Sequence, residues 1–225
     1  MFAAIAGSYD LNNRLHSLWQ DQRWRRFAVR AAGIHAGEST LDVACGTGEL
    51  AQYFARTGAA QVIGLDFTPQ MLEVARRKQL RLRGPHAAKL SYVQGDAMAL
   101  PFEAGSFDVV SIAFGIRNVA SPQGALSEFF RVLRPGGRLI VLEFDRPKNP
   151  AVRWLNDVYC GRIMPVTATL VSGDKSGAYK YLPASVSSFM SRADVCGSIR
   201  ETGFGQVTTT GLSLGICVCY RAVKA

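Results

Sequence analysis

Histidine and acidic residues are scarce in this 225-residue sequence, and it contains no long apolar run. Its five cysteines show no metal-ligand spacing, and we expect no metal site. No apolar stretch approaches the roughly 18 residues that a membrane-spanning helix needs, and no charged segment precedes an apolar signal core. An odd number of cysteines does not suit a closed disulfide framework. These absences predict a cytoplasmic protein with reduced thiols, whose contact with any membrane is peripheral.

The shortage of acids leaves a strongly basic chain. There are 26 Lys and Arg residues against 17 Asp and Glu, which gives a formal net charge of +9 and a pI near 9.6. This charge indicates an anionic partner, either nucleic acid or acidic membrane headgroups, although solubility alone also explains it. The run Arg23-Trp24-Arg25-Arg26 is the candidate for such a contact. A second run, residues 76–78, is interpreted as the solvated face of a helix.

The length suits one α/β domain, without repeats or low-complexity tracts. From residue 39 to 145, apolar strands alternate with helical segments, which is the pattern of a parallel sheet with crossover connections. Within this core, Thr68-Pro69 marks the start of one helix, with Thr as the cap and Pro in the first turn. The predicted segments are a helical cap (1–38, with helices at 9–18 and 20–32), the core (39–145), a substrate-covering insertion (146–205) and a terminal β-hairpin (206–225).

A glycine turn between two strands is the most informative part of the core. An apolar strand ending near Asp42 leads into Gly46-Thr47-Gly48, where the missing side chains let a ligand approach the backbone closely. The next strand ends at Asp66, whose carboxylate can accept hydrogen bonds from both hydroxyls of a ribose. The turn also fits the dinucleotide-binding fingerprint, so these residues alone do not distinguish a SAM-type cofactor from an NAD-type cofactor.

The continuation of the chain separates the two cofactor classes. Gly95-Asp96-Ala97 follows a third strand, residues 107–112 form a fourth, and Arg134-Pro135-Gly136-Gly137 precedes a fifth. This succession resembles the class I S-adenosylmethionine (SAM) methyltransferases. The resemblance implies a Rossmann-like α/β fold with a mostly parallel seven-stranded sheet and a C-terminal antiparallel hairpin.

The same resemblance implies a cofactor site for SAM. The glycine turn would surround the methionine part, Asp66 would hold the ribose, and Asp96 with Ala97 would contact the adenine. Asp42 would bind the methionine ammonium, or else serve as a structural carboxylate that caps the turn. The residues expected to bind the cofactor are Asp42, Gly46, Thr47, Gly48, Asp66, Asp96 and Ala97.

Further phrases narrow the resemblance to one family. The most specific is Phe114-Gly115-Ile116-Arg117-Asn118, and others lie at residues 64–72, 95–102, 136–144 and 181–183. Together they resemble the ubiquinone/menaquinone biosynthesis C-methyltransferase family over nearly the whole chain. The sequence departs from the usual pattern at Ala44, which replaces the first glycine of the general turn, at Ala113, where some members carry Ser, and at Asp145.

Membership of that family would imply methylation of a ring carbon of a polyprenylated quinol. The substrate would be demethylmenaquinol, or alternatively 2-polyprenyl-6-methoxy-1,4-benzoquinol on the ubiquinone route. We expect Arg117 and Asn118 to stabilise the ionised quinol oxygen. If a base is needed, water or one of Asp10, His16 and Asp145 would serve, and the sequence does not choose among them.

The prenyl tail and its membrane would need surfaces of their own. Aromatic and apolar residues of the cap and of the stretch 154–181 are candidates for a groove around the tail, or for an ordinary helical core. Arg23 to Arg26 would hold the protein on the anionic cytoplasmic face of a bilayer. Homo-oligomerisation is compatible with these features.

Three other functions remain as alternatives. The basic charge suits an RNA methyltransferase, but nucleic acid is not expected, because Phe114-Gly115 stands where base-methylating enzymes usually carry Asn or Asp followed by Pro-Pro. A NAD-dependent oxidoreductase would not account for Gly95-Asp96-Ala97. A non-catalytic scaffold is disfavoured by the intact motif residues.

Overall fold

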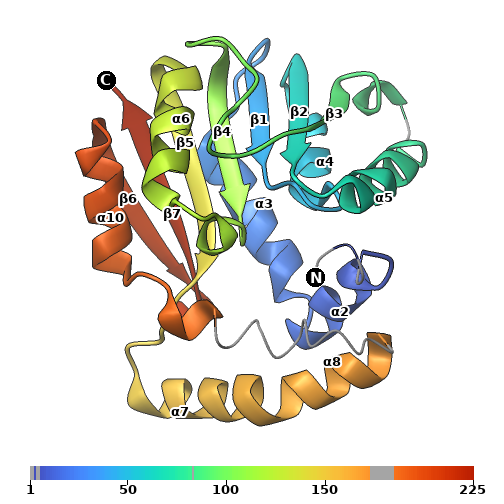
Figure 1. Cartoon of the computed structure of the whole chain (residues 1–225), viewed down its shortest axis with the longest axis vertical. Helices are drawn as coiled ribbons and strands as arrows, with labels where there is room; N and C mark the ends of the chain where they lie inside the picture. The colour runs from blue at the N-terminus through green and yellow to red at the C-terminus, as the bar shows by residue number, and fades with distance from the viewer. Residues whose placement is uncertain (1–2, 4–5, 83, 173–184) are drawn as a thin grey trace.

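A seven-stranded sheet with the order β3-β2-β1-β4-β5-β7-β6 forms the centre of the computed structural model, which describes residues 3, 6–82, 84–172 and 185–225 (Figure 1). Strands β1 to β5 are parallel, and β7 runs antiparallel to both of its neighbours. The predicted fold class and the terminal hairpin are therefore confirmed. The strands are β1 Ser39–Val43, β2 Gln61–Asp66, β3 Leu90–Gln94, β4 Phe107–Ala113, β5 Leu133–Phe144, β6 Phe204–Leu212 and β7 Cys217–Lys224.

Helices cover both faces of the sheet. One apolar cluster joins α3, α4 and α5 to one face, and another joins α6 and α10 to the other face (Figure 1). Side chains at 0–1% exposure, such as Leu41, Leu65 and Ile140, fill the space between the layers. The bounds are α3 Gln20–Ala32, α4 Glu49–Ala55, α5 Pro69–Gln79, α6 Pro122–Val132 and α10 Arg192–Glu201, with short 3₁₀ turns at η1 Gly84–His86, η2 Ile116–Asn118 and η4 Ser213–Gly215.

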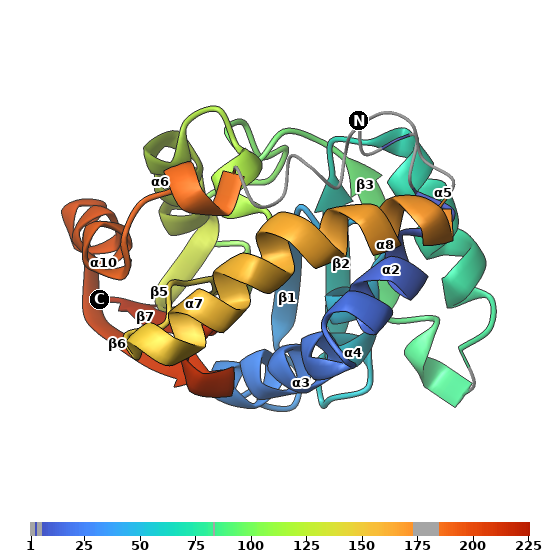
Figure 2. The ribbon, with the colours of Figure 1, turned by 90° about the horizontal axis from the view of Figure 1, so that it is seen from below.

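The remaining helices lie beyond the carboxyl ends of the parallel strands. Helix α7 (Pro150–Val158) continues through a π-helical turn, η3 (Tyr159–Ile163), into α8 (Met164–Ser172). This long rod crosses the end of the sheet, and α2 (Tyr9–His16) runs beside α8 (Figure 2). The hydroxyl of Tyr159 donates to the carbonyl of His16 at 3.0 Å and joins the two segments. Among the described residues, no helix combines the length and apolar character needed to cross a bilayer.

Local sequence signals explain where the helices begin and end. Helix α5 starts at Pro69 as predicted, although the side chain of Thr68 makes no capping hydrogen bond. Helix α2 ends before the predicted boundary because Leu18 and Trp19 adopt left-handed conformations, with φ of 50° and 60°. All five cysteines are free thiols, as expected. The family phrase at 181–183 and the end of the candidate groove stretch 154–181 lie outside the described residues.

Candidate active site

The order of the strands creates a crevice at the middle of the sheet. Strand β1 pairs with β2 on one side and with β4 on the other. The chain therefore extends the sheet from β1 toward one edge and, beginning with β4, toward the opposite edge. In open α/β sheets, ligands bind outside the carboxyl ends of the strands at such a switch point. The turns that follow β1, β2, β3 and β4 therefore bring most of the predicted site residues to one edge.

The turn after β1 requires unusual backbone conformations. Gly46 and Gly48 have φ of 55° and 77°, which suit glycine, while Ala44 is held at 50°. Ala44 thus occupies a strained position where the general motif has glycine. A Cβ at Gly48 would lie 2.1 Å from the hydroxyl oxygen of Tyr92, so the ring of Tyr92 excludes any side chain there. No local sequence pattern indicates this role of Tyr92.

Asp66 faces the glycine turn from the end of β2. The amide of Gly46 donates to its Oδ2 at 2.7 Å, and the amide of Thr68 donates to its Oδ1 at 2.8 Å. Burial raises the pKa of Asp66, and these two amides oppose that rise. Each oxygen keeps a second lone pair, so the fixed carboxylate can still accept from a ribose. In the loop after β3, Asp96 Oδ1 accepts from the amide of Met98 at 2.9 Å, and Ala97 is buried.

Asp42 is a buried carboxylate with one unsatisfied oxygen. Its exposed fraction is 1%, and Ser111 donates to its Oδ1 at 2.7 Å. Its Oδ2 is buried and has no hydrogen-bond partner among the described residues. Burial raises the pKa of Asp42 to about 7, although Ser111 and the charge of Arg25 act in the opposite direction. A carboxylate oxygen in this position fits the ammonium group of an amino-acid ligand.

Thr47 connects the glycine turn to the N-terminal cap. Its hydroxyl donates to Oδ1 of Asp10 at 2.5 Å, and Lys78 Nζ reaches Oδ2 of Asp10 at 2.7 Å. The same ammonium group lies 2.5 Å from Glu49 on α4. The expectation that residues 76–78 are only a solvated face is therefore wrong for Lys78, which is mostly buried in an ion-pair network.

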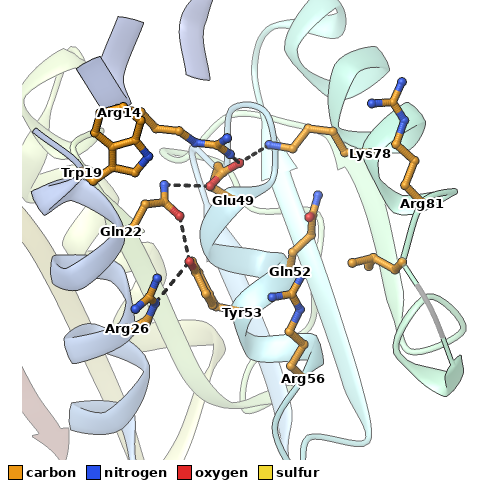
Figure 3. A pocket seen from close by; sticks show the side chains of 11 residues that line it. Arg14, Trp19, Gln22, Arg26, Glu49, Gln52, Tyr53, Arg56, Lys78 and Arg81 are labelled. Carbon is orange, nitrogen blue, oxygen red and sulfur yellow. Dashed lines mark hydrogen bonds and ion pairs between the residues drawn. The ribbon is translucent and has the colours of Figure 1, made fainter. Parts of the chain in front are cut away.

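Glu49 is the most strongly stabilised carboxylate of this network. Arg14 donates to it at 2.9 Å and Gln22 at 3.0 Å (Figure 3). Burial alone would raise the pKa of Glu49, but Lys78, Gln22 and Arg14 together lower it to about 2. The pair Arg14–Glu49 and the pair Lys78–Glu49 thus fix α2, α4 and α5 to one another beside the glycine turn.

This network forms one wall of a basic basin of about 450 Å³ (Figure 3). The basin lies over the outer face of α4, and none of Asp42, Asp66 and Asp96 lines it, so it is separate from the crevice of the switch point. Of the described residues that line it, five carry a cationic side chain and Glu49 alone carries a carboxylate. The lining residues are Arg14, Trp19, Gln22, Arg26, Glu49, Gln52, Tyr53, Arg56, Lys78, Arg81 and Leu82.

Arg117 lies just after β4 in the 3₁₀ turn η2. Its guanidinium forms a buried ion pair with Glu143 of β5, donates to the carbonyl of Phe114 at 2.9 Å and to Ser185 Oγ at 3.3 Å. Burial raises the pKa of Glu143, and the charge of Arg117 opposes the rise. Asn118 donates to the same Phe114 carbonyl at 3.3 Å. Sequence reasoning missed Glu143, although a lone acid inside an apolar strand is a signal.

The three candidate bases have different environments. Asp10 is engaged by Thr47 and Lys78, and Asp145 forms an ion pair with Arg192 of α10. Burial lowers the pKa of His16, and its Nε2 is buried without a hydrogen-bond partner among the described residues. Of the three candidate bases, His16 is therefore the one with a ring nitrogen that forms no hydrogen bond with a described residue.

Two surface expectations need correction. In the run 23–26, Trp24 and Arg25 are buried, and only the arginines on either side are exposed, so the run is not a continuous basic surface. Trp154, predicted to line a groove or a core, is 65% exposed. Periodicity places residues on a helix face, but it does not reveal which face meets the rest of the molecule.

The strand order with its reversed final strand, together with a glycine turn opposite an acid at the end of β2, defines a class I SAM-dependent methyltransferase. A solved SAM-dependent methyltransferase from Aquifex aeolicus has the same fold, with a TM-score of 0.64 at 16% identity over 89% of each chain. At that identity the likeness concerns the fold alone. More specifically, the chain belongs to the ubiE/COQ5 methyltransferase family, which matches residues 1–224.

Curated relatives are similar over almost their full length. Demethylmenaquinone methyltransferase of Thermus thermophilus is 46% identical over 205 residues, which cover 91% of this chain and 91% of the relative. The ubiquinone/menaquinone biosynthesis C-methyltransferase UbiE of Geobacter sp. is 40% identical over 226 residues, covering 100% of this chain and 94% of the relative. The protein is therefore an enzyme that transfers a methyl group from SAM, and the resemblance noted in the sequence is confirmed.

Proposed function

We propose that the enzyme methylates a ring carbon of a polyprenylated quinol, and that its substrate is demethylmenaquinol. The similarity to the Thermus thermophilus demethylmenaquinone methyltransferase carries this proposal. The related benzoquinol of ubiquinone biosynthesis is the second candidate, because the Geobacter relative is named for both quinones. SAM supplies an electrophilic methyl group on a sulfonium, which becomes a neutral sulfide, and the ring loses one proton.

The proposed cofactor contacts follow the geometry of the crevice. Gly46 and Gly48 leave the backbone open to the methionine part, and Thr47 fixes the turn to the cap. Asp66 accepts from the ribose hydroxyls with the lone pairs that its two amide donors leave free. Asp96 and Ala97, in the loop after β3, contact the adenine. The unpartnered Oδ2 of Asp42 is the observation that best supports an amino-acid headgroup nearby.

Arg117 and Asn118 are proposed to stabilise the quinol oxygen as it ionises. Ionisation moves negative charge onto the ring carbon and makes it nucleophilic, and a fixed cation in a poorly solvated site favours this state. A guanidinium carries only hydrogen-bond donors and no acceptor, so another group has to take the proton. The ion pair with Glu143 orients the guanidinium, and its position after β4 places it at the same edge of the sheet as Asp42.

The prenyl tail is proposed to leave the enzyme through the face of α7, η3 and α8. No residue of α7 or η3 is buried, although both contain large apolar side chains. Trp154, Leu155, Ile163 and Val166 are all at least 48% exposed. A helical rod with exposed apolar side chains, lying at the carboxyl edge of the sheet, suits contact with the acyl region of a membrane. A polyprenylated quinol resides in that region.

The test is methyl transfer from labelled SAM under reducing conditions. The acceptors are a short-chain demethylmenaquinol, a short-chain 2-prenyl-6-methoxy-1,4-benzoquinol and bulk RNA, offered separately. We expect label on the ring of the naphthoquinol. Transfer only to the benzoquinol would reassign the substrate, and label only in RNA would overturn the proposal.

A further inference from the structure

The basin over α4 gathers positive charge that the described carboxylates do not neutralise. Glu49, the one acidic residue among the described residues that line it, is already held by three donors. Arg26, Arg56 and Arg81 line the same basin, are exposed, and form no ion pair with any residue that the structure describes (Figure 3). Like charges repel one another, and a bound anion relieves that repulsion. The basin is therefore suited to an anionic ligand.

Tyr53 on α4 holds two of these arginines in place. The guanidinium carbon of Arg26 lies 5.9 Å from the centre of the Tyr53 ring, and that of Arg56 lies 5.7 Å from it. The Tyr53 hydroxyl donates to Oε1 of Gln22 at 2.7 Å, which fixes the ring against α3. Cation–π contacts leave most N–H groups of a guanidinium free for an acceptor. Because both groups are positioned before a ligand arrives, less entropy is lost on binding.

Helix α5 supplies the opposite wall of the basin. Lys78 lies in the last turn of α5, and Arg81 follows just after its end, where the amide of Arg81 donates to the carbonyl of Lys78 at 3.0 Å. In Figure 3 these two side chains lie on one side of α4 and Arg26 lies on the other side. A ligand that meets cations on both sides needs several oxygens and more than one negative charge. A phosphate monoester or a diphosphate has both, and its oxygens match the planar fork of arginine.

Trp19 borders the cations with a flat apolar surface. It also lines the basin, and it is 55% exposed. Its backbone adopts the left-handed conformation, with φ of 60°, and its amide donates to the carbonyl of Arg14 at 2.8 Å. Residues other than glycine adopt this conformation at an energetic cost, and strained residues of this kind cluster at functional sites. An indole held beside cations in this way suits contact with the organic part of a phosphate ester.

We propose that the basin binds a phosphate-bearing anion at a site separate from the SAM crevice. Arg26, Arg56 and Arg81 donate to the phosphate oxygens, and Trp19 contacts the organic part of the ligand. The volume of about 450 Å³ suits a small molecule or a lipid headgroup. The phosphate belongs to a soluble phosphate ester or to the headgroup of a membrane lipid, and the same contacts recognise both. Binding at this site does not depend on which quinol the enzyme methylates.

Calorimetric titration with inorganic pyrophosphate and with glycerol 3-phosphate tests the site in solution. The double variant Arg56→Gln/Arg81→Gln removes two cations of the basin and should weaken the binding of both probes by roughly 10-fold or more. The matched control Arg30→Gln/Arg200→Gln removes the same charge from exposed positions outside the lining and should bind both probes normally. Pyrophosphate should also raise the melting temperature of the unmodified enzyme and of the control, and it should raise that of Arg56→Gln/Arg81→Gln less.

Flotation with phosphatidylcholine vesicles, prepared with and without phosphatidic acid, distinguishes the two sources of the phosphate. A loss of flotation that requires phosphatidic acid and is confined to Arg56→Gln/Arg81→Gln would identify the lipid headgroup as the ligand. Equal flotation of the two double variants, with weaker pyrophosphate binding in Arg56→Gln/Arg81→Gln, would identify a soluble phosphate ester. Either outcome supports the site.

Other results would overturn the proposal. Equal affinity of the two double variants for every phosphate probe would attribute any binding to net charge, and no binding by the unmodified enzyme would exclude the site. Both double variants should bind SAM and transfer methyl groups normally, and a fall in SAM affinity confined to Arg56→Gln/Arg81→Gln would make the basin part of the cofactor site. If bulk RNA were the one ligand whose binding depended on Arg56 and Arg81, the basin would be a nucleic-acid surface instead.

Discussion

At the scale of single residues, the charged groups near the crevice depend on partners that lie far away in the sequence. Arg117 is paired with Glu143, and Asp145 is paired with Arg192 across 47 positions. Breaking a buried ion pair leaves one charge uncompensated and typically costs about 3–5 kcal/mol. Truncating such a residue would therefore lower both the stability and the activity of the enzyme, and the two effects could not be separated. Substitutions that keep charge or shape give clearer results.

Arg117→Lys is expected to lower kcat by roughly 10- to 100-fold and to leave the Kd for SAM nearly unchanged. Lysine keeps the charge opposite Glu143 but lacks the planar fork that orients several hydrogen bonds. Steady-state kinetics with a short-chain quinol and separate SAM titrations measure the two effects. Asp66→Asn is the counterpart and should weaken SAM while changing kcat less. An equal loss of SAM affinity in both variants would contradict this division of roles.

Asp42 is expected to make the stability of the ligand-free enzyme depend on pH. Its pKa is raised to about 7 in the folded protein, above the value near 4 of the unfolded chain. Between these two values the folded state keeps a proton on Asp42 that the unfolded chain has lost. The free energy of unfolding therefore falls as pH rises from about 4 through 7. Denaturant unfolding between pH 5 and 8 measures the slope. Asp42→Asn should flatten it, and an identical slope in that variant would refute the assignment to Asp42.

At the scale of secondary-structure elements, the cap is joined to the glycine turn by charges. Helix α2 supplies Asp10 and Arg14, the turn supplies Thr47, and α4 and α5 supply Glu49 and Lys78. Lys78 contacts both carboxylates and is the shared member of the network. Movement of α2 relative to the turn would therefore have to break several charge-assisted hydrogen bonds at once.

Lys78→Met should destabilise the protein by about 1–3 kcal/mol at pH 7 and weaken SAM binding, because Asp10 and Glu49 lose their common partner. The pKa of Glu49 is lowered to about 2, so its stabilising effect is present above about 4.5 and is lost as pH falls toward 2. In the variant that pKa should rise, and acid unfolding should begin at higher pH. Circular dichroism during acid titration measures this.

Arg77→Met is the matched control for the Lys78 variant, because Arg77 is 72% exposed and pairs only with Glu73 in a surface contact among the described residues. It should leave both the acid midpoint and SAM affinity within error of the unmodified enzyme. If Arg77→Met and Lys78→Met shifted the acid transition equally, net charge rather than the network would be responsible.

At the scale of the whole molecule, four exposed large apolar side chains, Trp154, Leu155, Ile163 and Val166, follow one another along a single rod. The rod of α7, η3 and α8 lies at the carboxyl edge of the sheet, where the proposed quinol would enter (Figure 2). The net charge of +9 adds a long-range attraction to anionic lipid. Apolar insertion and electrostatic attraction together are the usual basis of peripheral membrane binding.

The double variant Trp154→Ser/Leu155→Ser should reduce flotation with vesicles of anionic phospholipid by at least about fivefold, since it removes two exposed apolar side chains. Methyl transfer to a short-chain quinol in solution should be unchanged. Leu80→Ser, which changes a residue that is 86% exposed on another part of the surface, is the control. Binding of the unmodified enzyme should also fall as salt rises. Equal flotation of the double variant and the unmodified enzyme would exclude this face.

The sequence by itself determined the sheet, the glycine turn, the position of Asp66 at the end of the second strand and the family, because these depend on local patterns. Alternating apolar strands predict a parallel sheet wherever they occur, and a ligand-facing turn needs glycine whatever surrounds it. Even the helix at 20–32 was predicted with its observed bounds.

Only the tertiary structure decided which charged and aromatic residues are buried and what they meet. Arg25 and Arg26 are adjacent on α3, yet Arg25 is buried and Arg26 is exposed. Arg117 meets Glu143 through strand pairing that joins β4 to β5, and Trp154 remains exposed because its helix packs beyond the sheet edge. Burial and ion pairing are set by segments distant in the chain, and the local pattern of residues does not contain that information.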